Sequence, residues 1–119
     1  TLILQPNIGA QFIRKWLIAE GWELKAEEIL EEDEKIYEIL VAEKGEPLNP
    51  YRELSFEAAE LMGPFLLKEK NPIFLKKWTM ELKHWKKILK QIESSENERT
   101  QEKKEEIQKS IELVEEALQ

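Results

Sequence analysis

The chain has 119 residues, a formal net charge of −7 and no cysteine. It is long enough for one modest domain or two smaller units, and the lack of cysteine excludes a disulfide framework and a cysteine-based metal site. Its uninterrupted apolar runs are too short for a membrane span or a signal peptide, so we expect a soluble cytoplasmic protein without a membrane partner.

The first stretch, from Leu2 to Leu4, contains three consecutive aliphatic residues. A run without alternation indicates a strand that is covered on both faces, as in the centre of a parallel sheet. Such a strand needs neighbours reached through crossover helices, and none precedes it. We therefore expect the C-terminal part of a larger α/β domain. The alternative is an edge strand that begins a small α+β domain.

A helix is expected directly after this strand, with Asn7 as its N-cap and Gly21 as the left-handed residue that ends it. The expected buried face consists of Phe12, Ile13, Trp16 and Leu17, and the expected solvent face of Arg14, Lys15 and Glu20. Ligands bind at the carboxyl ends of parallel strands, so Gln5, Pro6 and Asn7 would face a binding crevice. Alternatively, Pro6 only stops the strand and Asn7 only caps the helix.

The next segment predicts a β-hairpin. Trp22, Leu24 and Ala26 alternate with Glu23, Lys25 and Glu27, which indicates a half-buried strand with the charged residues facing solvent. The alternation slips near Glu28 and Ile29, where we expect a bulge. A polar turn over residues 32–35 leads into the nearly continuous apolar run 36–42. We expect this second strand to lie inside the sheet and the alternating strand at its edge.

The remainder predicts helices. Ser55 and Asn71-Pro72 are helix starts, and Gly63-Pro64 separates two short helices. Two series of residues then follow at spacings of four and three: Phe74, Trp78, Leu82, Trp85, Leu89 and Ile92, and Thr100, Lys104, Ile107, Ile111, Val114 and Leu118. They predict an antiparallel coiled-coil hairpin with arms at about 72–93 and 98–119. We expect two domains, 1–45 and 46–119, and tryptophans that serve the core rather than a ligand.

Positive charge is concentrated in one of these helices. Residues 66–90 hold eight basic and two acidic side chains, whereas residues 93–119 hold four and nine. With the tryptophans turned inward, a basic stripe faces solvent: Lys76, Lys77, Lys83, Lys87 and Lys90. Such an extended cationic surface suits the phosphates of RNA. Alternatively, these lysines pair with the acidic helix beside them, and no exposed aromatic residues are interleaved for base stacking.

Residues for acid-base or metal chemistry are few. His84 is the single histidine, and we expect it on the exposed side of the basic helix without a metal. The acidic residues 31–34 are better explained as a turn than as a catalytic carboxylate pair. The four glycines are isolated, so the chain has no glycine-rich phosphate loop and no complete cofactor site of its own. We assign no catalytic residue.

Several segments together resemble the TrmK family, bacterial S-adenosylmethionine-dependent methyltransferases that act on N1 of adenine 22 in tRNA. They are residues 2–7, Ile13-Arg14-Lys15-Trp16-Leu17, Gly21-Trp22, Glu32-Asp33, residues 35–39 and Leu61-Met62-Gly63-Pro64. The resemblance covers nearly all of residues 1–75, and the helical hairpin is similar in kind to the family's C-terminal domain. The glycine-rich cofactor loop and the Gly-Met-Gly-Gly segment that the family carries upstream are absent.

The resemblance implies an α/β fold with an all-α appendage: the fifth to seventh strands of a Rossmann-like methyltransferase sheet, followed by the coiled-coil hairpin. It implies a tRNA methyltransferase whose S-adenosylmethionine site lies mostly outside this chain, so that the chain alone is inactive. Gln5 and Asn7 would contact the adenine, and the lysine stripe would hold the tRNA. The alternative is a non-enzymatic helical module that binds RNA or protein. Bare sheet and helix surfaces also predict self-association.

Overall fold

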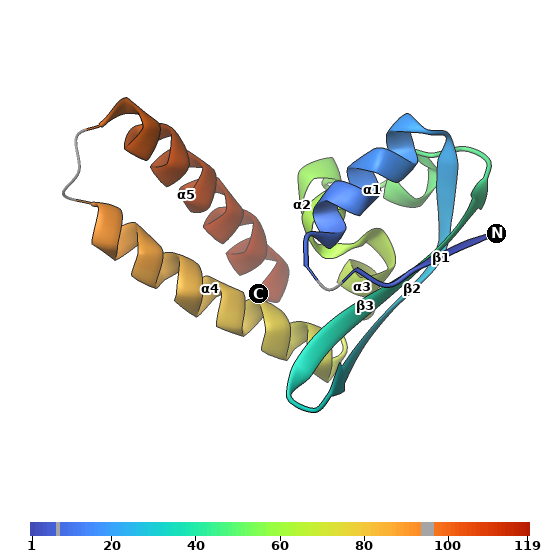
Figure 1. Ribbon diagram of the computed structural model, residues 1–119, viewed down its shortest axis with the longest axis horizontal. Coiled ribbons are helices and arrows are strands. Elements are labelled where there is room, and N and C mark those ends of the chain that lie inside the picture. Colours follow the sequence, from blue (N-terminus) through green and yellow to red (C-terminus); the bar gives the residue numbers. More distant parts are fainter. Residues whose placement is uncertain (7, 94–96) are drawn as a thin grey trace. The chain divides into compact units, whose positions relative to one another are not determined.

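The computed structural model describes residues 1–6, 8–93 and 97–119. The described chain consists of three strands, five α-helices and one short 3-10 helix (Figure 1). It divides into two compact units, Thr1–Phe74 and Leu75–Gln119. The boundary predicted after residue 45 concerns the division of the complete protein and stays a prediction.

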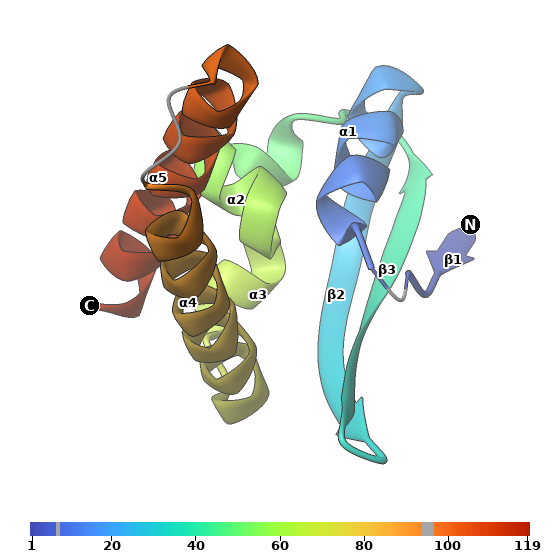
Figure 2. The same cartoon turned by 60° about the vertical axis from the view of Figure 1, so that its left-hand side comes forward.

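The first unit contains one sheet, built from β1 (Leu2–Leu4), β2 (Trp22–Glu32) and β3 (Lys35–Lys44). The strand order is β1-β3-β2 and both pairings are antiparallel, with Leu2 opposite Ala42 (Figure 2). The central position of the apolar second hairpin strand and the edge position of the first are therefore confirmed. Within this sheet β1 forms the other edge, beside an antiparallel neighbour.

The hairpin turn lies where the polar residues predict it. Asp33 and Glu34 connect β2 to β3 and have φ values of 50° and 67°. Two left-handed residues in a two-residue turn match the right-handed twist of the flanking strands. Acidic side chains there keep the turn in solvent.

The bulge is in a different place from the predicted one. The register of β2 against β3 shifts between Leu24 and Ala26, not near Glu28. Lys25 and Ala26 are both exposed, and the inward positions beyond the bulge are Glu27 and Ile29. The prediction that Glu27 faces solvent is thus wrong, because one extra residue at Lys25 reverses the side of every later residue.

Helix α1 (Ala10–Ala19) begins later than predicted. Its N-cap is Gly9, with φ 72° and no side-chain cap, so the prediction of Asn7 as the N-cap is wrong; Asn7 lies outside the described residues. Glycine adopts this left-handed conformation without strain, which turns the chain into the helix. At the other end Gly21 has φ 80° and its N–H donates to Ile18, as predicted.

The buried face of α1 is only partly the predicted one: Leu17 is buried and Ile13 packs against the core, as predicted, but Phe12 and Trp16 are not buried. Ala10, Arg14 and Leu17 are buried, whereas Phe12 is 62% and Trp16 47% exposed. The helix packs on β2 and on α2 through the Ala10–Arg14–Leu17 face. The prediction that Arg14 faces solvent is therefore wrong, and the aromatic side of α1 is left largely uncovered within the described residues.

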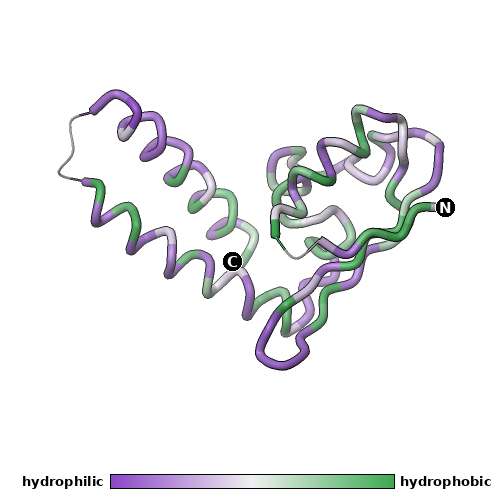
Figure 3. The backbone as a smooth tube through the Cα atoms, viewed as in Figure 1, coloured by the Kyte–Doolittle hydropathy of each residue, from purple (hydrophilic) through white to green (hydrophobic). Residues whose placement is uncertain are grey.

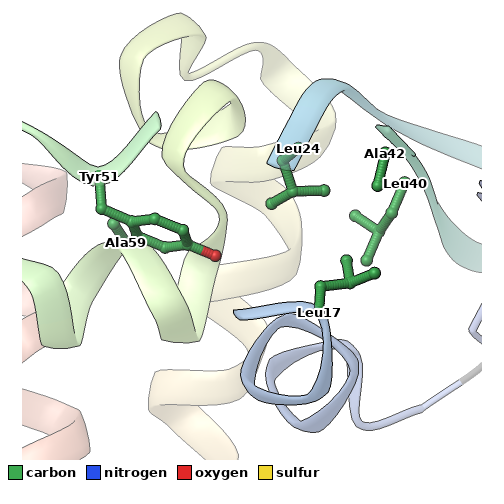
Figure 4. Close-up of a cluster of buried hydrophobic side chains, with 6 residues drawn as sticks. All are labelled: Leu17, Leu24, Leu40, Ala42, Tyr51 and Ala59. Carbon is green, nitrogen blue, oxygen red and sulfur yellow. The ribbon is translucent and has the colours of Figure 1, made fainter. Parts of the chain in front are cut away.

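The core of the first unit lies between the sheet and its helices. The short elements η1 (Asn49–Tyr51), α2 (Phe56–Met62) and α3 (Pro64–Glu69) complete this layer, and the Ser55 hydroxyl accepts from the N–H of Ala58, as predicted for a helix start. Figure 4 shows the buried cluster, in which Leu17 of α1 faces side chains of both long strands: Leu17, Leu24, Leu40, Ala42, Tyr51 and Ala59.

Two long helices, α4 (Pro72–Ile92) and α5 (Glu98–Leu118), agree with the predicted arms to within one residue at each end. Asn71 accepts from the N–H of Phe74, and Asn97 accepts from the N–H of Arg99. The helices lie side by side and run in opposite directions (Figures 1 and 2), and apolar segments recur along both (Figure 3). Trp78 is 4% exposed and its ring lies 6.2 Å from that of Trp85, which fits a core role.

Candidate nucleic-acid interface

Four of the five predicted lysines share one side of α4. Lys76, Lys83, Lys87 and Lys90 are spaced by seven, four and three residues, which places them in one row along a helix. All four are exposed, and we call them the α4 lysine face. Glu81 is the single acidic residue between Pro72 and Ile92, and helical geometry puts it on the other side. The face is therefore uniformly cationic.

Lys77 and Lys86 differ from these four. Lys77 is half-buried, and its Nζ lies 4.8 Å from the centre of the Trp78 ring. Its ammonium group therefore makes a cation–π contact with its own helix. Lys86 Nζ lies 2.9 Å from Glu115 Oε2 of α5. For Lys86, the alternative expectation, that a lysine of α4 pairs with the acidic helix α5, is therefore met.

An exposed methionine lies inside the α4 lysine face. Met80 is four residues after Lys76 and three before Lys83, and it is 58% exposed. The helical spacing already contained this signal, but the sequence interpretation considered only aromatic residues. His84 borders the face and is exposed, as predicted. In the described part of the chain, no group of three or more side chains is arranged to hold a metal ion.

The predicted pocket residues follow β1 directly. Gln5 is exposed one residue after Leu4, and Pro6 is half-buried. Gln5 therefore lies at the carboxyl end of its strand, where the prediction put it. Asn7 lies outside the described residues, so its predicted role as a substrate ligand stays a prediction.

A buried ionic cluster, missed by sequence reasoning, joins four elements of the first unit. Arg14 of α1 donates from Nε to Glu27 of β2 at 2.8 Å and from Nη2 to Glu38 of β3. Its Nη1 donates to the main-chain oxygens of Glu60 and Leu61 in α2, at 3.3 and 3.2 Å. Burial disfavours the guanidinium charge, but the two carboxylates outweigh burial and hold the pKa of Arg14 above its ordinary value. Arg14 thus stays charged, whereas burial raises the pKa of Glu27 above its ordinary value.

Glu27 also fixes the start of α3. Its Oε1 accepts from the N–H groups of Phe65 and Leu66 at 2.9 and 3.4 Å. The preceding Gly63 has φ 98°, and a Cβ there would lie 2.7 Å from Arg14 Nη2 and from Glu27 Oε1. A glycine is required at this point because the cluster fills the space. The sequence signal was the spacing of Arg14, four residues after Ala10 and three before Leu17, which are both buried.

Glu23 makes a second, partly buried contact, with the loop that follows β3. Its carboxylate accepts from the Glu46 N–H at 2.9 Å, from Asn49 Nδ2 at 3.2 Å and from Lys25 Nζ at 3.1 Å. These donors, the Glu46 N–H foremost, hold the pKa of Glu23 below its ordinary value. Glu23 was predicted to face solvent and is 8% exposed; that prediction is wrong because Glu46 and Asn49 of the following loop cover its carboxylate. The contact ties the loop to the sheet.

The described residues do not fit a complete cofactor site. Three of the four glycines end or begin a helix with positive φ, and Gly45 packs so closely on Glu23 that a Cβ would lie 2.6 Å from its Oε1. None belongs to a glycine-rich loop whose N–H groups could surround a nucleoside ligand. Nor does any helix of the described residues have the length and apolar character for a membrane crossing.

Comparison with known proteins gives one family. Residues 1–116 match the family model described as TrmK: tRNA (adenine(22)-N(1))-methyltransferase. The chain is 49% identical over 118 residues to the curated tRNA (adenine(22)-N(1))-methyltransferase of Bacillus subtilis, which covers 98% of this chain and 50% of that protein. The chain therefore spans about half the length of the curated relative that it matches.

Solved structures have the same fold. The crystal structure of the B. subtilis M1A22 tRNA methyltransferase TrmK matches with a TM-score of 0.93, covering 99% of this chain and 51% of that one. A Streptococcus pneumoniae structure in complex with S-adenosyl-L-methionine matches at 36% identity with a TM-score of 0.78, covering 99% and 47%. A protein of the NADB-Rossmann superfamily from Streptococcus agalactiae matches at 33% identity with a TM-score of 0.81, covering 99% and 47%.

Proposed function

Because this chain belongs to the TrmK family, we propose that it is the C-terminal portion of an enzyme that transfers a methyl group from S-adenosylmethionine to N1 of an adenine in tRNA. The observation that carries this proposal is the match over residues 1–116, together with 49% identity to the B. subtilis enzyme. A non-enzymatic RNA- or protein-binding module is the weaker alternative, because these relatives are named as methyltransferases. Such an enzyme works in the cytoplasm.

In the complete protein the sheet of this chain continues past β1. The side chains of β3 that face α1 are buried, and those of its other side are half-buried although apolar: Tyr37, Ile39 and Val41. Ile3 of β1, opposite Val41, is 69% exposed. A sheet that is apolar on both faces suits a Rossmann-like domain with helices on each side. The rest of the enzyme would supply that cover and the S-adenosylmethionine site.

Gln5 and Asn7 would form the edge of the adenine pocket. Neutral adenine already carries a lone pair on N1, so the protein needs no base to activate it. Its task is to hold the adenine outside the stack, in line with the methyl donor and away from water. Amide side chains at the carboxyl end of β1 can recognise the polar edge of the base.

The lysines of α4 would hold the body of the tRNA, and α4 and α5 would form an antiparallel coiled-coil hairpin that keeps them extended. The α4 lysine face is a row of cations without an acidic residue between them, which is the surface that phosphates require. Lys77, which is half-buried, would contribute less than the other four. The apolar spacing along both helices and the buried Ile107, Ile111 and Val114 support the hairpin.

This chain by itself would associate with other copies. Phe12 and Trp16, one turn apart on α1, and the nearby Ile8 are 62%, 47% and 91% exposed. Large apolar groups of this kind are usually covered by another protein surface. In the complete enzyme we expect its remaining half to cover them. Sedimentation of the 119-residue chain should therefore give a mass above that of a monomer, and an ideal monomer would contradict this part of the proposal.

The enzymatic proposal is tested by a methylation assay on the complete protein. Purified enzyme, S-adenosylmethionine and a tRNA transcript should yield a reverse-transcription stop at adenine 22, because a methyl group on N1 blocks base pairing. A transcript with guanine at that position is the matched control and should give no stop. Binding of tRNA without any methyl transfer would favour the non-enzymatic module.

The lysine proposal is tested by reversing charge. The triple variant Lys76→Glu, Lys83→Glu, Lys87→Glu should bind tRNA at least about 100-fold more weakly, with a shallower dependence on salt. The matched control reverses three exposed lysines off this face, Lys35, Lys68 and Lys103. Equal affinity of the two triple variants would refute the role of the α4 lysine face.

A further inference from the structure

A pocket of about 250 Å³ lies between α4 and α5. Five of its six lining residues have polar or charged side chains, three lysines and one carboxylate among them: Lys86, Leu89, Lys90, Glu93, Lys104 and Gln108. All six lining residues belong to the second compact unit, Leu75–Gln119, so the pocket lies within one unit. Three lysine side chains at one pocket favour an anionic group as its ligand.

Lys104 is the unusual residue of this pocket. It occupies a position of the α5 series that is otherwise apolar toward the C-terminus, three residues before the buried Ile107, and it is half-buried itself. A lysine at a seam position between two helices costs stability relative to an apolar residue. Neither Lys104 nor Lys90 has an ion pair with the described residues. A lysine at position 104 is explained if an anion binds in the pocket and pairs with it.

The pocket is continuous with the α4 lysine face. Lys90 belongs to both, since it is the last member of that face and one of the pocket lysines. Lys86, one turn earlier on α4, is partly neutralised by Glu115 at 2.9 Å, and Glu93 adds one negative charge. Three ammonium groups against one lining carboxylate leave the pocket cationic at neutral pH.

We propose that this pocket is a subsite for one backbone phosphate of the bound RNA, held by Lys90 and Lys104 with Lys86 beside them. The RNA strand would follow the α4 lysine face and then cross the seam onto α5 at Lys104. Phosphate oxygens accept hydrogen bonds from several ammonium groups at once, and Gln108 can donate another. This inference rests on the proposed tRNA-binding function and adds a place where α5 takes part in it.

The test is Lys104→Met in the complete protein, with tRNA affinity measured at several salt concentrations. Methionine has a similar length and suits the seam, so the variant should be as thermally stable as the parent or more so. Loss of one phosphate contact should weaken binding by about five- to tenfold and reduce the salt slope by about 0.7 to 0.9. The matched control is Lys103→Met, which removes the same charge from the neighbouring exposed position outside the pocket.

A second variant keeps the test independent of any effect on folding. Glu93→Gln removes the pocket carboxylate and should tighten tRNA binding, whereas Glu102→Gln, on an exposed position of α5 outside the pocket, should change it less. If Lys104→Met binds tRNA as Lys103→Met does, the subsite is refuted. If calorimetry with inorganic phosphate finds a tight site that tRNA does not compete for, the pocket serves a free anion and the inference is also refuted.

The outcomes separate this inference from the proposed function. Weak tRNA binding by the triple α4 variant together with normal binding by Lys104→Met would remove the subsite and leave the function intact. Normal tRNA binding by both would remove the lysine face as well. Weak binding by both, with a salt slope of Lys104→Met about 0.7 to 0.9 below that of the parent, is the result that supports a strand crossing from α4 to α5.

Discussion

Arg14 Nε and Glu27 Oε2 lie 2.8 Å apart in the interior of the first unit, and both side chains are fully buried. Arginine and glutamate usually lie at protein surfaces, but here both are buried. Glu38, whose side chain is 4% exposed, forms the second ion pair with Arg14. Because α1, β2 and β3 each contribute one of the three, the cluster fixes the position of the helix on the sheet. Removal of the cluster should therefore lower the free energy of unfolding of the whole first unit.

Replacement of Arg14 by methionine should destabilise the protein strongly. The variant keeps the bulk of the side chain but leaves two buried carboxylates without their cation, which typically costs about 3–5 kcal/mol. Urea unfolding measures the loss. The control is Lys15→Met, since Lys15 is exposed and lies 3.8 Å from Glu60, and it should cost less than about 1 kcal/mol. Similar unfolding midpoints for the two variants would contradict a stabilising role of the cluster.

Two glycine variants should differ although both glycines have positive φ. Gly21→Ala introduces a Cβ with nothing within 4 Å, so it should cost only the backbone strain of roughly 1–2 kcal/mol. Gly63→Ala adds a Cβ 2.7 Å from Arg14 Nη2, which must displace a charged hydrogen bond worth another 1.5–3 kcal/mol or so. Thermal unfolding should rank Gly63→Ala well below Gly21→Ala. The reverse order would mean that Arg14 and Glu27 can move away from the added Cβ at little energetic cost.

Glu23 should make the stability depend on pH in the acid range. Its pKa is lowered in the folded protein, foremost by the Glu46 N–H, so its contribution is complete above the ordinary value of 4.5. This contribution is lost as the pH falls through the lowered pKa. Between pH 5 and about pH 3 the parent should lose more stability than Glu23→Gln. Glu28→Gln, exposed on the same strand, is the control and should follow the parent.

Tyr51→Phe should leave the stability unchanged or raise it. The Tyr51 hydroxyl is buried and has no hydrogen-bond partner among the described residues, so its removal relieves a desolvation cost. Burial also raises the pKa of Tyr51 above its ordinary value of 10.0, so folding of the parent should weaken above about pH 10, where the unfolded chain ionises. Tyr51→Phe should weaken less there. A clear loss of stability at neutral pH would indicate a partner for the hydroxyl.

The elements themselves could be predicted from the sequence because their signals are local. Ser55, Asn71 and Gly21 cap or end helices where their side chains or φ values require it, and the apolar spacing gave both long helices. The order of the hairpin strands followed from the more continuous apolar run of β3. Exposure of Lys76, Lys83, Lys87 and Lys90 also followed from spacing alone.

The interior of the first unit could not be predicted in the same way. A bulge at Lys25 leaves no compositional mark, yet it decides whether Glu27 faces solvent or Arg14. The spacing of Arg14 between Ala10 and Leu17 hints at burial, but its carboxylate partners lie 13 and 24 residues away, and the helical pattern of α1 cannot identify them. The lysine-lined pocket depends on which residues of α4 and α5 come together, and that too is a long-range fact.

The strand order also dictates a sequence of events during synthesis. Of the three described strands β3 is the last to leave the ribosome, yet it lies between the other two, so Leu2 finds its partner Ala42 only after 40 further residues have emerged. Until then β1 lacks its antiparallel partner β3. We therefore expect the pairing of β1 with β3 to form after the β2–β3 hairpin, because the hairpin contacts are closer in the sequence.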